Sequence, residues 1–418
     1  MVREFLNNNF KGDKIIWIIY ACLLLFSAVE VYSASSHLVY GNVFKGDYNG
    51  AIFKHIVFCC MGIMTAFVTH QFKLRRFAKF ITFVVFPCLL IWVAVLSISG
   101  GGTNGAARWA TFRGINMQPS EFLKLSYVVA IAYLFSRYSE VKKTFSLLTF
   151  WLVLLGGLTV LCIVRENVSN AILVGTTTWL IFTLAFNKLR WLVYSILFAG
   201  LCIFSVVEFA KTDLFQDIRK TAIRQDGFLN RAGTAMGRLD RFVNEKEPGE
   251  EGFTLNDKNF QSVHGKVAIA NSWGIGVFPG RSKERDVLPE AFSDFIYAII
   301  IEETGLLGGG FVLLLYIVLL YRVGRIIAKC NNRFCAIVAA GLCMMMILQA
   351  LINTSVAVGL IPVTGQPLPL ISRGGTSAVA VSAYFGIIIG ISRFECNNEE
   401  KDDDAIEDIE SQNVINET

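Results

Sequence analysis

The stretch from Pro289 to Gly310, PEAFSDFIYAIIIEETGLLGGG, combines carboxylates with a long apolar run. It begins polar and then turns apolar, so Asp294 lies where a polar loop is expected to enter a membrane helix. The positive end of a helix dipole favours an ionised carboxylate, and an ionised carboxylate at a membrane edge can act as a general base. The alternative is that Asp294 only caps the helix, since Asp is common at that position. Glu302 and Glu303 follow roughly 12 Å deeper, where carboxylates are costly and indicate function.

Residues suited to an anionic substrate lie in the third loop and the helix after it. Arg108 lies in this loop, and Glu121 and Lys124 follow the sequence QPS at a spacing of i, i+3, which lets them pair on a helix. Cations beside an external pocket suit a diphosphate or another anionic head group. The alternative is an interfacial ion pair, with Arg108 and Trp109 as head-group anchors.

A long loop, at about 211–290, offers further polar residues. Arg238 and Arg241 in AMGRLDRFVNE share a face if that piece is helical. Gln261 follows, and then the glycine-rich WGIGVFPGRS, in which the glycines could let backbone approach a ligand but more often form a simple turn.

The stretch NTSVAVGLIPVTGQPLPLISRGGTS interrupts the apolar pattern near the C-terminus. Pro362, Pro367 and Pro369 cannot lie inside a regular helix without cost. Irregular backbone at membrane depth is tolerated only where it is buried in protein or lines a cavity. The stretch therefore predicts a re-entrant loop beside the site; a plain external connection is the alternative.

The composition is that of a polytopic membrane protein. Of 418 residues, 54% are hydrophobic and only 17% are charged, against about 25% in soluble domains, and the mean hydropathy is +0.53. The net charge of +5 is small, and we expect no nucleic-acid partner. None of the ten cysteines falls in the long loop, so no disulfide framework or metal-ligand spacing is predicted.

Ten apolar runs predict an all-α fold with about ten transmembrane helices. They lie at 15–34, 51–70, 79–98, 121–137, 145–164, 171–187, 190–210, 291–321, 333–360 and 376–393. The run at 291–321 is too long for one upright span, which predicts that it is tilted or begins outside the bilayer.

Basic residues in alternate short loops predict that both termini are cytoplasmic. We expect a cytoplasmic N-terminus at 1–14 and a membrane domain at 15–394, with the long loop at 211–290 between helices seven and eight. The acidic segment 395–418 is expected to be a disordered cytoplasmic tail. The site around Asp294 is then extracytoplasmic.

Four separated stretches, in this order, resemble the SEDS family, the group that contains FtsW, RodA and SpoVE. They are VYSASS (31–36), ARW with QPSEFLKL (107–125), PEAFSDFIYAIIIEETGLLG (289–308) and PVTGQPLPLISRGGTS (362–377). The resemblance covers almost the whole membrane region, and GQPLPLIS is more similar to FtsW than to RodA.

The resemblance implies a peptidoglycan glycosyltransferase that polymerises lipid II at the outer face of a bacterial cytoplasmic membrane. The family's catalytic aspartate falls on Asp294, its glutamate and lysine after Q-P-S on Glu121 and Lys124, and its arginine pair on Arg238 and Arg241. The implied partners are lipid II, a class B penicillin-binding protein, other division proteins and membrane lipids.

Two departures from the family pattern limit what can be carried over. Where the family often has P-D-(L/F)-G-T-A, this chain has ENVSNA, from Glu166 to Ala171. Arg373 replaces the usual Tyr of S-Y-G-G. Roles of those family residues are not transferred to this chain, and neither departure involves Asp294.

These lines of reasoning converge on one mechanism. Asp294 would deprotonate the acceptor sugar's 4-hydroxyl, which attacks the anomeric carbon of a lipid-diphosphate donor in one inverting step. Lys124, Arg238 and Arg241 would stabilise the leaving diphosphate. The chemistry also suggests a divalent cation, Mg²⁺ or Mn²⁺, although no metal-ligand cluster stands out in the sequence.

Two other classes of function stay open from the sequence. A lipid II flippase would also be polytopic and carry intramembrane charges, here Glu30, Lys54, His55, Glu302 and Glu303. The third possibility is a scaffold that recruits division proteins through the acidic tail.

Overall fold

A computed structural model describes most of the apolar part of the chain. The described residues are 10–34, 48–99, 110–112, 115–138, 145–164, 166–185, 193–194, 210, 212, 228–244, 254–255, 259–288 and 291–396.

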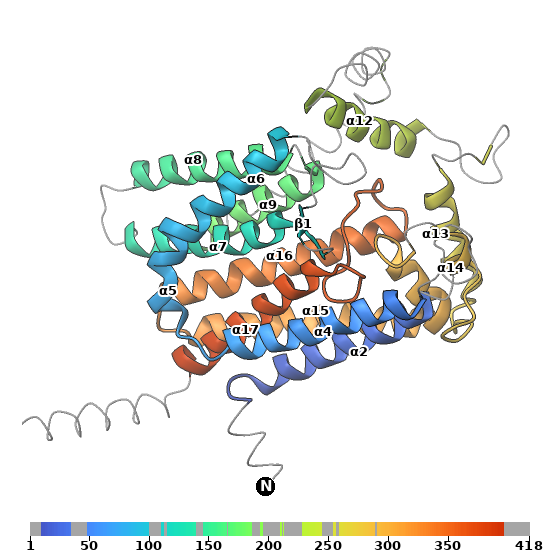
Figure 1. The fold of residues 1–418 in the computed structure, drawn as a ribbon, viewed down its shortest axis with the longest axis horizontal. Helices are drawn as coiled ribbons and strands as arrows, with labels where there is room; N and C mark the ends of the chain where they lie inside the picture. Colours follow the sequence, from blue (N-terminus) through green and yellow to red (C-terminus); the bar gives the residue numbers. More distant parts are fainter. Residues whose placement is uncertain are drawn as a thin grey trace, which may run out of the picture.

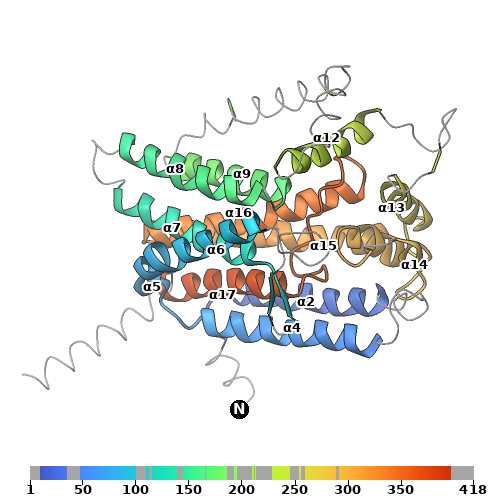
Figure 2. The same ribbon diagram turned by 45° about the horizontal axis from the view of Figure 1, so that its top comes forward.

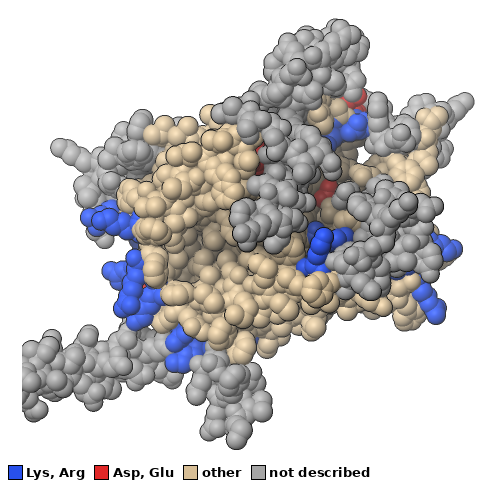
Figure 3. All heavy atoms as spheres, in the orientation of Figure 1, with Lys and Arg blue, Asp and Glu red and all other residues tan. Residues whose placement is uncertain are grey.

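Long apolar helices, lying roughly side by side, form the body of the protein (Figures 1 and 2). They are α2 (Lys14–Ala34), α4 (Tyr48–Thr69), α5 (Leu74–Phe80) continued by the π-helical turn η1 (Ile81–Val85) into α6 (Phe86–Ser99), α7 (Pro119–Tyr138), α8 (Phe145–Val164), α9 (Val168–Ala185), α15 (Ile296–Lys329), α16 (Arg333–Ala357) and α17 (Thr376–Cys396). Lys and Arg side chains gather at the end of the bundle near α5, at the left of Figure 3.

The helices confirm a polytopic α-helical membrane protein. Within the described residues, five helical segments are long and apolar enough to cross a membrane: Lys14–Ser33, Leu74–Leu96, Ile296–Lys329, Arg333–Ala357 and Thr376–Glu395. The predicted span at 190–210 lies almost wholly outside the described residues, so the count of ten stays a prediction. A short antiparallel hairpin in the third loop, β1 (Ala110–Phe112) with β2 (Ile115–Met117), was not foreseen.

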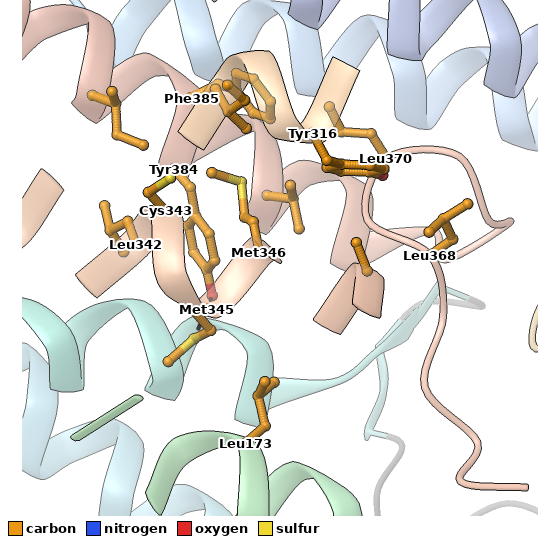
Figure 4. Close-up of a cluster of buried hydrophobic side chains, with 14 of the residues drawn as sticks. Leu173, Tyr316, Leu342, Cys343, Met345, Met346, Leu368, Leu370, Tyr384 and Phe385 are labelled. Atoms are coloured by element: carbon orange, nitrogen blue, oxygen red, sulfur yellow. Dashed lines mark hydrogen bonds between the residues drawn. The ribbon is translucent and has the colours of Figure 1, made fainter. Parts of the chain in front are cut away.

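The hydrophobic core lies where α15, α16 and α17 meet the 358–375 loop. Figure 4 shows Tyr316, Met345, Met346, Leu370 and Tyr384 converging there, and all five are nearly inaccessible. The buried hydroxyls keep hydrogen-bond partners, as burial requires: Tyr316 donates to the carbonyl of Pro369 at 2.5 Å, and Tyr384 to that of Glu121 at 3.3 Å. The core therefore fixes the 358–375 loop to the helices beneath it.

The long loop between α9 and α15 contains helices of its own. They are α12 (Phe228–Asn244), α13 (Phe260–Asn271) and the single turn α14 (Glu284–Val287). All three lie at the end of the bundle opposite to α5 (Figure 1).

A break at Gly305 divides α15 into a short first part and a long second part. Gly305 has φ 73° and ψ −174°, a conformation essentially restricted to glycine. The second part, residues 306–329, is by itself about 36 Å long, enough to span a bilayer. The break in the helix accounts for the excess length of the predicted run. The sequence predicts a tilt or a start outside the bilayer and does not predict a break.

The backbone of residues 274–278 fills the break. The amides of Val277 and Phe278 donate to the carbonyls of Glu302 and Glu303 at 2.9 and 2.8 Å, and the amide of Leu306 donates to the carbonyl of Gly274 at 3.1 Å. The glycines of this stretch let its backbone come close to the backbone of α15: a Cβ on Gly276 would lie 2.5 Å from the carbonyl oxygen of Glu303. This close approach explains the glycines without a ligand.

The two buried glutamates of α15 bind the same loop. Glu302 accepts the hydroxyl of Ser282 and the amide of Lys283, the latter at 3.2 Å. Glu303 accepts the hydroxyl of Ser33 at 2.5 Å and pairs with Arg285 at 3.5 Å. These contacts give Glu302 and Glu303 structural partners, so a transport pathway is not needed to account for their burial.

Gly305→Ala is expected to destabilise the protein by roughly 2–6 kcal/mol. An added Cβ would lie 2.5 Å from the carbonyl oxygen of Gly274 and would also impose an unfavourable φ. Gly310→Ala is the matched control, because a Cβ there meets nothing within 4 Å and a helical Gly→Ala change usually stabilises. Thermal unfolding midpoints in detergent should therefore move in opposite directions; equal midpoints would contradict the role of the break.

Candidate active site

Asp294 lies two residues before α15, at its entry, as the sequence predicts. The N-cap of α15 is Phe295, so Asp294 precedes the cap position. Asp294 is partly exposed; its carboxylate accepts the hydroxyl of Ser293 at 3.0 Å, while its carbonyl accepts the side-chain amide of Asn353 at 2.9 Å. The backbone is thus fixed, and the residue is only partly buried; a general base must lie within hydrogen-bond reach of the proton that it takes.

The 358–375 loop packs around this aspartate. An ideal Cβ on Gly365 would lie 3.6 Å from Oδ2 of Asp294, so the loop passes close to the carboxylate. Ser372 donates to the carbonyl of Ser293 at 2.7 Å, and Asn353 donates to the carbonyl of Gln366 at 2.8 Å. Most of residues 366–372 are therefore buried beside Asp294, whereas residues 358–365 are partly or fully exposed. The irregular backbone is present as expected, and its re-entrant course stays a prediction.

A buried ion pair occupies the first turns of α7. Glu121 and Lys124 are 2.8 Å apart, and their side chains are 4% and 0% exposed. Lys124 also donates to the side-chain oxygen of Asn170 at 3.3 Å. The predicted pairing is confirmed, but the pair is buried among helices, which does not fit the alternative of an interfacial pair.

The start of α7 and the end of the 358–375 loop meet at the start of α17. The amide of Gln118, one residue before α7, donates to the hydroxyl of Thr376 at 3.2 Å, and Thr376 directly follows the 358–375 loop. This hydrogen bond links the beginning of α7, the helix of Lys124, to the end of the loop that packs beside Asp294.

Arg238 also reaches the loop beside Asp294. It lies on α12, and its guanidinium donates to the carbonyl of Val363 at 3.3 Å. Arg241 lies one turn further along the same helix and is partly exposed. The helix that would place both arginines on one face is therefore present, and Arg238 is joined to the site.

Gln261 lies on α13, which packs against the start of α15. An added Cβ on Gly265 would lie 2.8 Å from the ring of Phe295. Gln261 and Gly265 are spaced i, i+4 and share a face of the helix, so the partly exposed Gln261 is directed toward the same region. Arg108, the remaining predicted site residue, lies outside the described residues.

Two residues at the site were missed from the sequence. Asn170 belongs to ENVSNA, the stretch that departs from the family pattern, and it binds Lys124. Asn353 bridges the carbonyls of Asp294 and Gln366 from within α16. Asn353 could have been noticed as a polar side chain in an apolar run. Asn170 could not, because its contact with Lys124 depends on how α7 and α9 pack.

The described part of the chain offers no preformed metal site. Within it, no three or more His, Cys, Asp or Glu side chains are grouped so that they could hold an ion. The residues near Asp294 therefore do not by themselves fit a resident divalent cation.

The family model described as cell cycle protein, FTSW_RODA_SPOVE, matches residues 13–397. The chain is 26% identical over 398 residues to the probable peptidoglycan glycosyltransferase FtsW of Geobacter metallireducens, covering 93% of this chain and 98% of that protein. It is 27% identical over 388 residues to the stage V sporulation protein E of Bacillus subtilis (91% and 97% covered). It is 27% identical over 384 residues to the peptidoglycan glycosyltransferase MrdB of Escherichia coli K12 (91% and 93% covered).

Solved structures share the fold at low sequence identity. A chain from a structure described as a peptidoglycan synthase complex, in which polymerization and crosslinking are coordinated, superposes with a TM-score of 0.68 at 19% identity, covering 91% of this chain and 98% of that one. The rod shape determining protein RodA of Thermus thermophilus gives a TM-score of 0.60 at 20% identity (93% and 98% covered).

Proposed function

Because the chain belongs to the FtsW/RodA/SpoVE family of cell cycle proteins, we propose that it is a peptidoglycan glycosyltransferase that polymerises lipid II. The observation that carries the proposal is the placement of Asp294, a partly exposed residue whose backbone is fixed by Asn353 and whose carboxylate lies beside the 358–375 loop. The reaction would take place at the outer face of a bacterial cytoplasmic membrane, and the proposal rests on relatives with this activity.

Asp294 is the general base of the proposed mechanism. Its carboxylate takes the proton from the 4-hydroxyl of the acceptor sugar as that oxygen attacks the anomeric carbon of the donor. The bond between this carbon and the diphosphate oxygen breaks in the same step, so the configuration at the carbon inverts. A positioned base of this kind contributes about 10²- to 10⁴-fold to the rate.

Cations stabilise the diphosphate as its bond to the sugar breaks. Arg238 is the best placed, because it already contacts the loop beside Asp294, and Arg241 follows on the same helix. Arg108 and Gln261 complete the proposed binding set. An arginine suits this task, since its fixed fork of donors matches phosphate oxygens.

Lys124 and Glu121 take a different part in the proposal. Lys124 is fully buried between Glu121 and Asn170, so it reaches a substrate only where the head group enters the helix bundle. We propose that the pair sets the electrostatic potential of the inner wall of the site. A divalent cation, Mg²⁺ or Mn²⁺, would enter with the diphosphate, which supplies the oxygen ligands that the described residues lack.

The proposed partner is a class B penicillin-binding protein, which would crosslink the strands. Support comes from a structural neighbour that belongs to a peptidoglycan synthase complex. We propose a role in septal synthesis with other division proteins, on the similarity of GQPLPLIS to FtsW; a RodA-like role in elongation is the alternative. Depletion of the protein in its own bacterium would give filaments under the first and rounded cells under the second.

Glycan-chain formation from purified lipid II tests the proposed function. The full chain in detergent would be assayed alone and with a class B penicillin-binding protein whose transpeptidase is inactivated. We expect polymer in at least one of the two conditions, and more with the partner. Absence of polymer in both, together with lipid II scrambling in liposomes, would overturn the proposal in favour of a flippase.

A further inference from the structure

A basic pocket lies at the end of the bundle opposite to Asp294. Its volume is about 370 Å³, and it forms where the beginning of α2, the last turns of α15 and Ser392 of α17 meet. The basic side chains that line it are Lys14, Arg322, Arg325 and Lys329. The cavity is large enough for several oxygen atoms of an anionic ligand.

The acidic side chain of the pocket is already engaged. Asp13 pairs with Arg322 at 2.5 Å and accepts the amide of Ile15 at 2.9 Å, while its own amide donates to the hydroxyl of Ser392 at 2.8 Å. Asp13 therefore connects α2, α15 and α17, and its negative charge balances the positive charge of Arg322. It cannot also neutralise the other cations.

Arg325 and Lys329 supply the pocket's excess positive charge. Both are exposed, one turn apart near the end of α15, and Arg325 donates to the hydroxyl of Tyr321 at 3.3 Å. Among the residues that the structure describes, no carboxylate pairs with either of them. The pocket is thus a positively charged hollow that an anionic group would neutralise.

A segment of opposite charge begins next to this pocket. Residues 397–418 directly follow α17, and Ser392, one helical turn before the end of α17, lines the pocket. This segment contains a single basic residue, Lys401. Its acidic residues are Glu399, Glu400, Asp402, Asp403, Asp404, Glu407, Asp408, Glu410 and Glu417.

We propose that the acidic segment 397–418 docks in the basic pocket of its own chain, chiefly through the run at 399–404. Eight residues span at most about 28 Å when extended, and Ser392 of the pocket lies only four residues before the end of α17, so this run is within reach of the pocket. Tethering also raises its effective concentration into the millimolar range. A soluble anion, such as inorganic phosphate, has no such advantage; an anionic lipid of the surrounding bilayer is the competing occupant that the test below distinguishes.

Docking of this kind depends on several weak charge pairs acting together. Each exposed pair contributes little and is screened by salt. The contact is therefore expected to be strong at low ionic strength and to weaken steeply as salt is added. This salt dependence distinguishes it from apolar association of the tail with the membrane.

Photo-crosslinking in the full chain tests the proposal. A benzophenone amino acid replaces Ile406, and the protein is placed in nanodiscs of zwitterionic lipid. We expect adducts on the pocket residues, with a yield that falls at least fivefold in Arg325→Gln/Lys329→Gln and at high salt. The matched control is Arg76→Gln/Lys79→Gln, which removes two exposed cations of α5 at the same end of the bundle and should leave the yield within twofold.

Exchanging the charges of the tail and of the pocket separates docking from any general effect of the substitutions on folding. Asp402→Lys/Asp403→Lys/Asp404→Lys is expected to abolish the adducts, and Arg325→Glu/Lys329→Glu is expected to restore them in that background. Adducts that do not depend on the pocket charges would overturn the proposal. A second result would also overturn it: the wild-type protein forms no adducts in zwitterionic nanodiscs, and it enriches anionic lipid in a way that depends on Arg325. The pocket would then be assigned to a lipid head group.

Discussion

Asp294→Asn is expected to lower the rate of glycan-chain formation by about 10²- to 10⁴-fold, because the amide cannot take the proton of the attacking hydroxyl. The substitution preserves size, and the carbonyl of Asp294 would still accept from Asn353, whose bond at 2.9 Å involves only the backbone of Asp294. Lipid II binding and the unfolding midpoint should therefore change little. The measurement is initial polymerisation rate against lipid II concentration, with binding followed separately.

Asp286→Asn is the control for a change of charge. Asp286 is also a carboxylate of the loop before α15, its side chain is 51% exposed, and it pairs with Arg285 rather than with any site residue. Its rate should remain within twofold of the unsubstituted protein. If Asp294→Asn kept more than a tenth of the activity, the base would have to be sought elsewhere.

Lys124→Met is expected to destabilise the protein by about 3–5 kcal/mol, because it leaves the buried Glu121 carboxylate without its cation. One oxygen of that carboxylate, Oε2, has no hydrogen-bond partner among the described residues, so Lys124 carries most of the compensation. Chemical unfolding in detergent micelles would measure the loss.

The double variant Glu121→Gln/Lys124→Met separates stability from function. Replacing both members of a buried ion pair by uncharged side chains of similar size is often neutral, so the unfolding midpoint should largely recover. We expect polymerisation to stay at least tenfold below that of the unsubstituted protein. If the unfolding midpoint and the polymerisation rate both recovered, the role of the pair would be structural only.

The sequence is informative where a local pattern decides the outcome. Asp294 lies at a change from polar to apolar residues, which is enough to place it at a helix entry. Glu121 and Lys124 have the spacing that permits pairing on any helix, and Pro362, Pro367 and Pro369 exclude a regular helix. Each of these features depends only on neighbours along the chain, and the structure agrees with each.

Features that depend on packing between distant segments could not be predicted. The run 305–310 contains four glycines, and only the contact with residues 274–278 selects Gly305 as the break. Likewise, nothing local indicates that Asn170 meets Lys124, since 46 residues separate them. Burial of the Glu121–Lys124 pair has the same origin: the neighbouring helices determine it, and spacing alone leaves it open.

The break at Gly305 has a consequence for biogenesis. Residues 306–329 carry no carboxylate and suffice for a translocon to recognise a membrane segment, so insertion does not require residues 296–304. The loop that binds Glu302 and Glu303 precedes α15 in the chain and is synthesised before it. The two glutamates therefore need not enter lipid unpaired: the short segment that leads from Asp294 can dock onto finished protein after the spanning segment is in place.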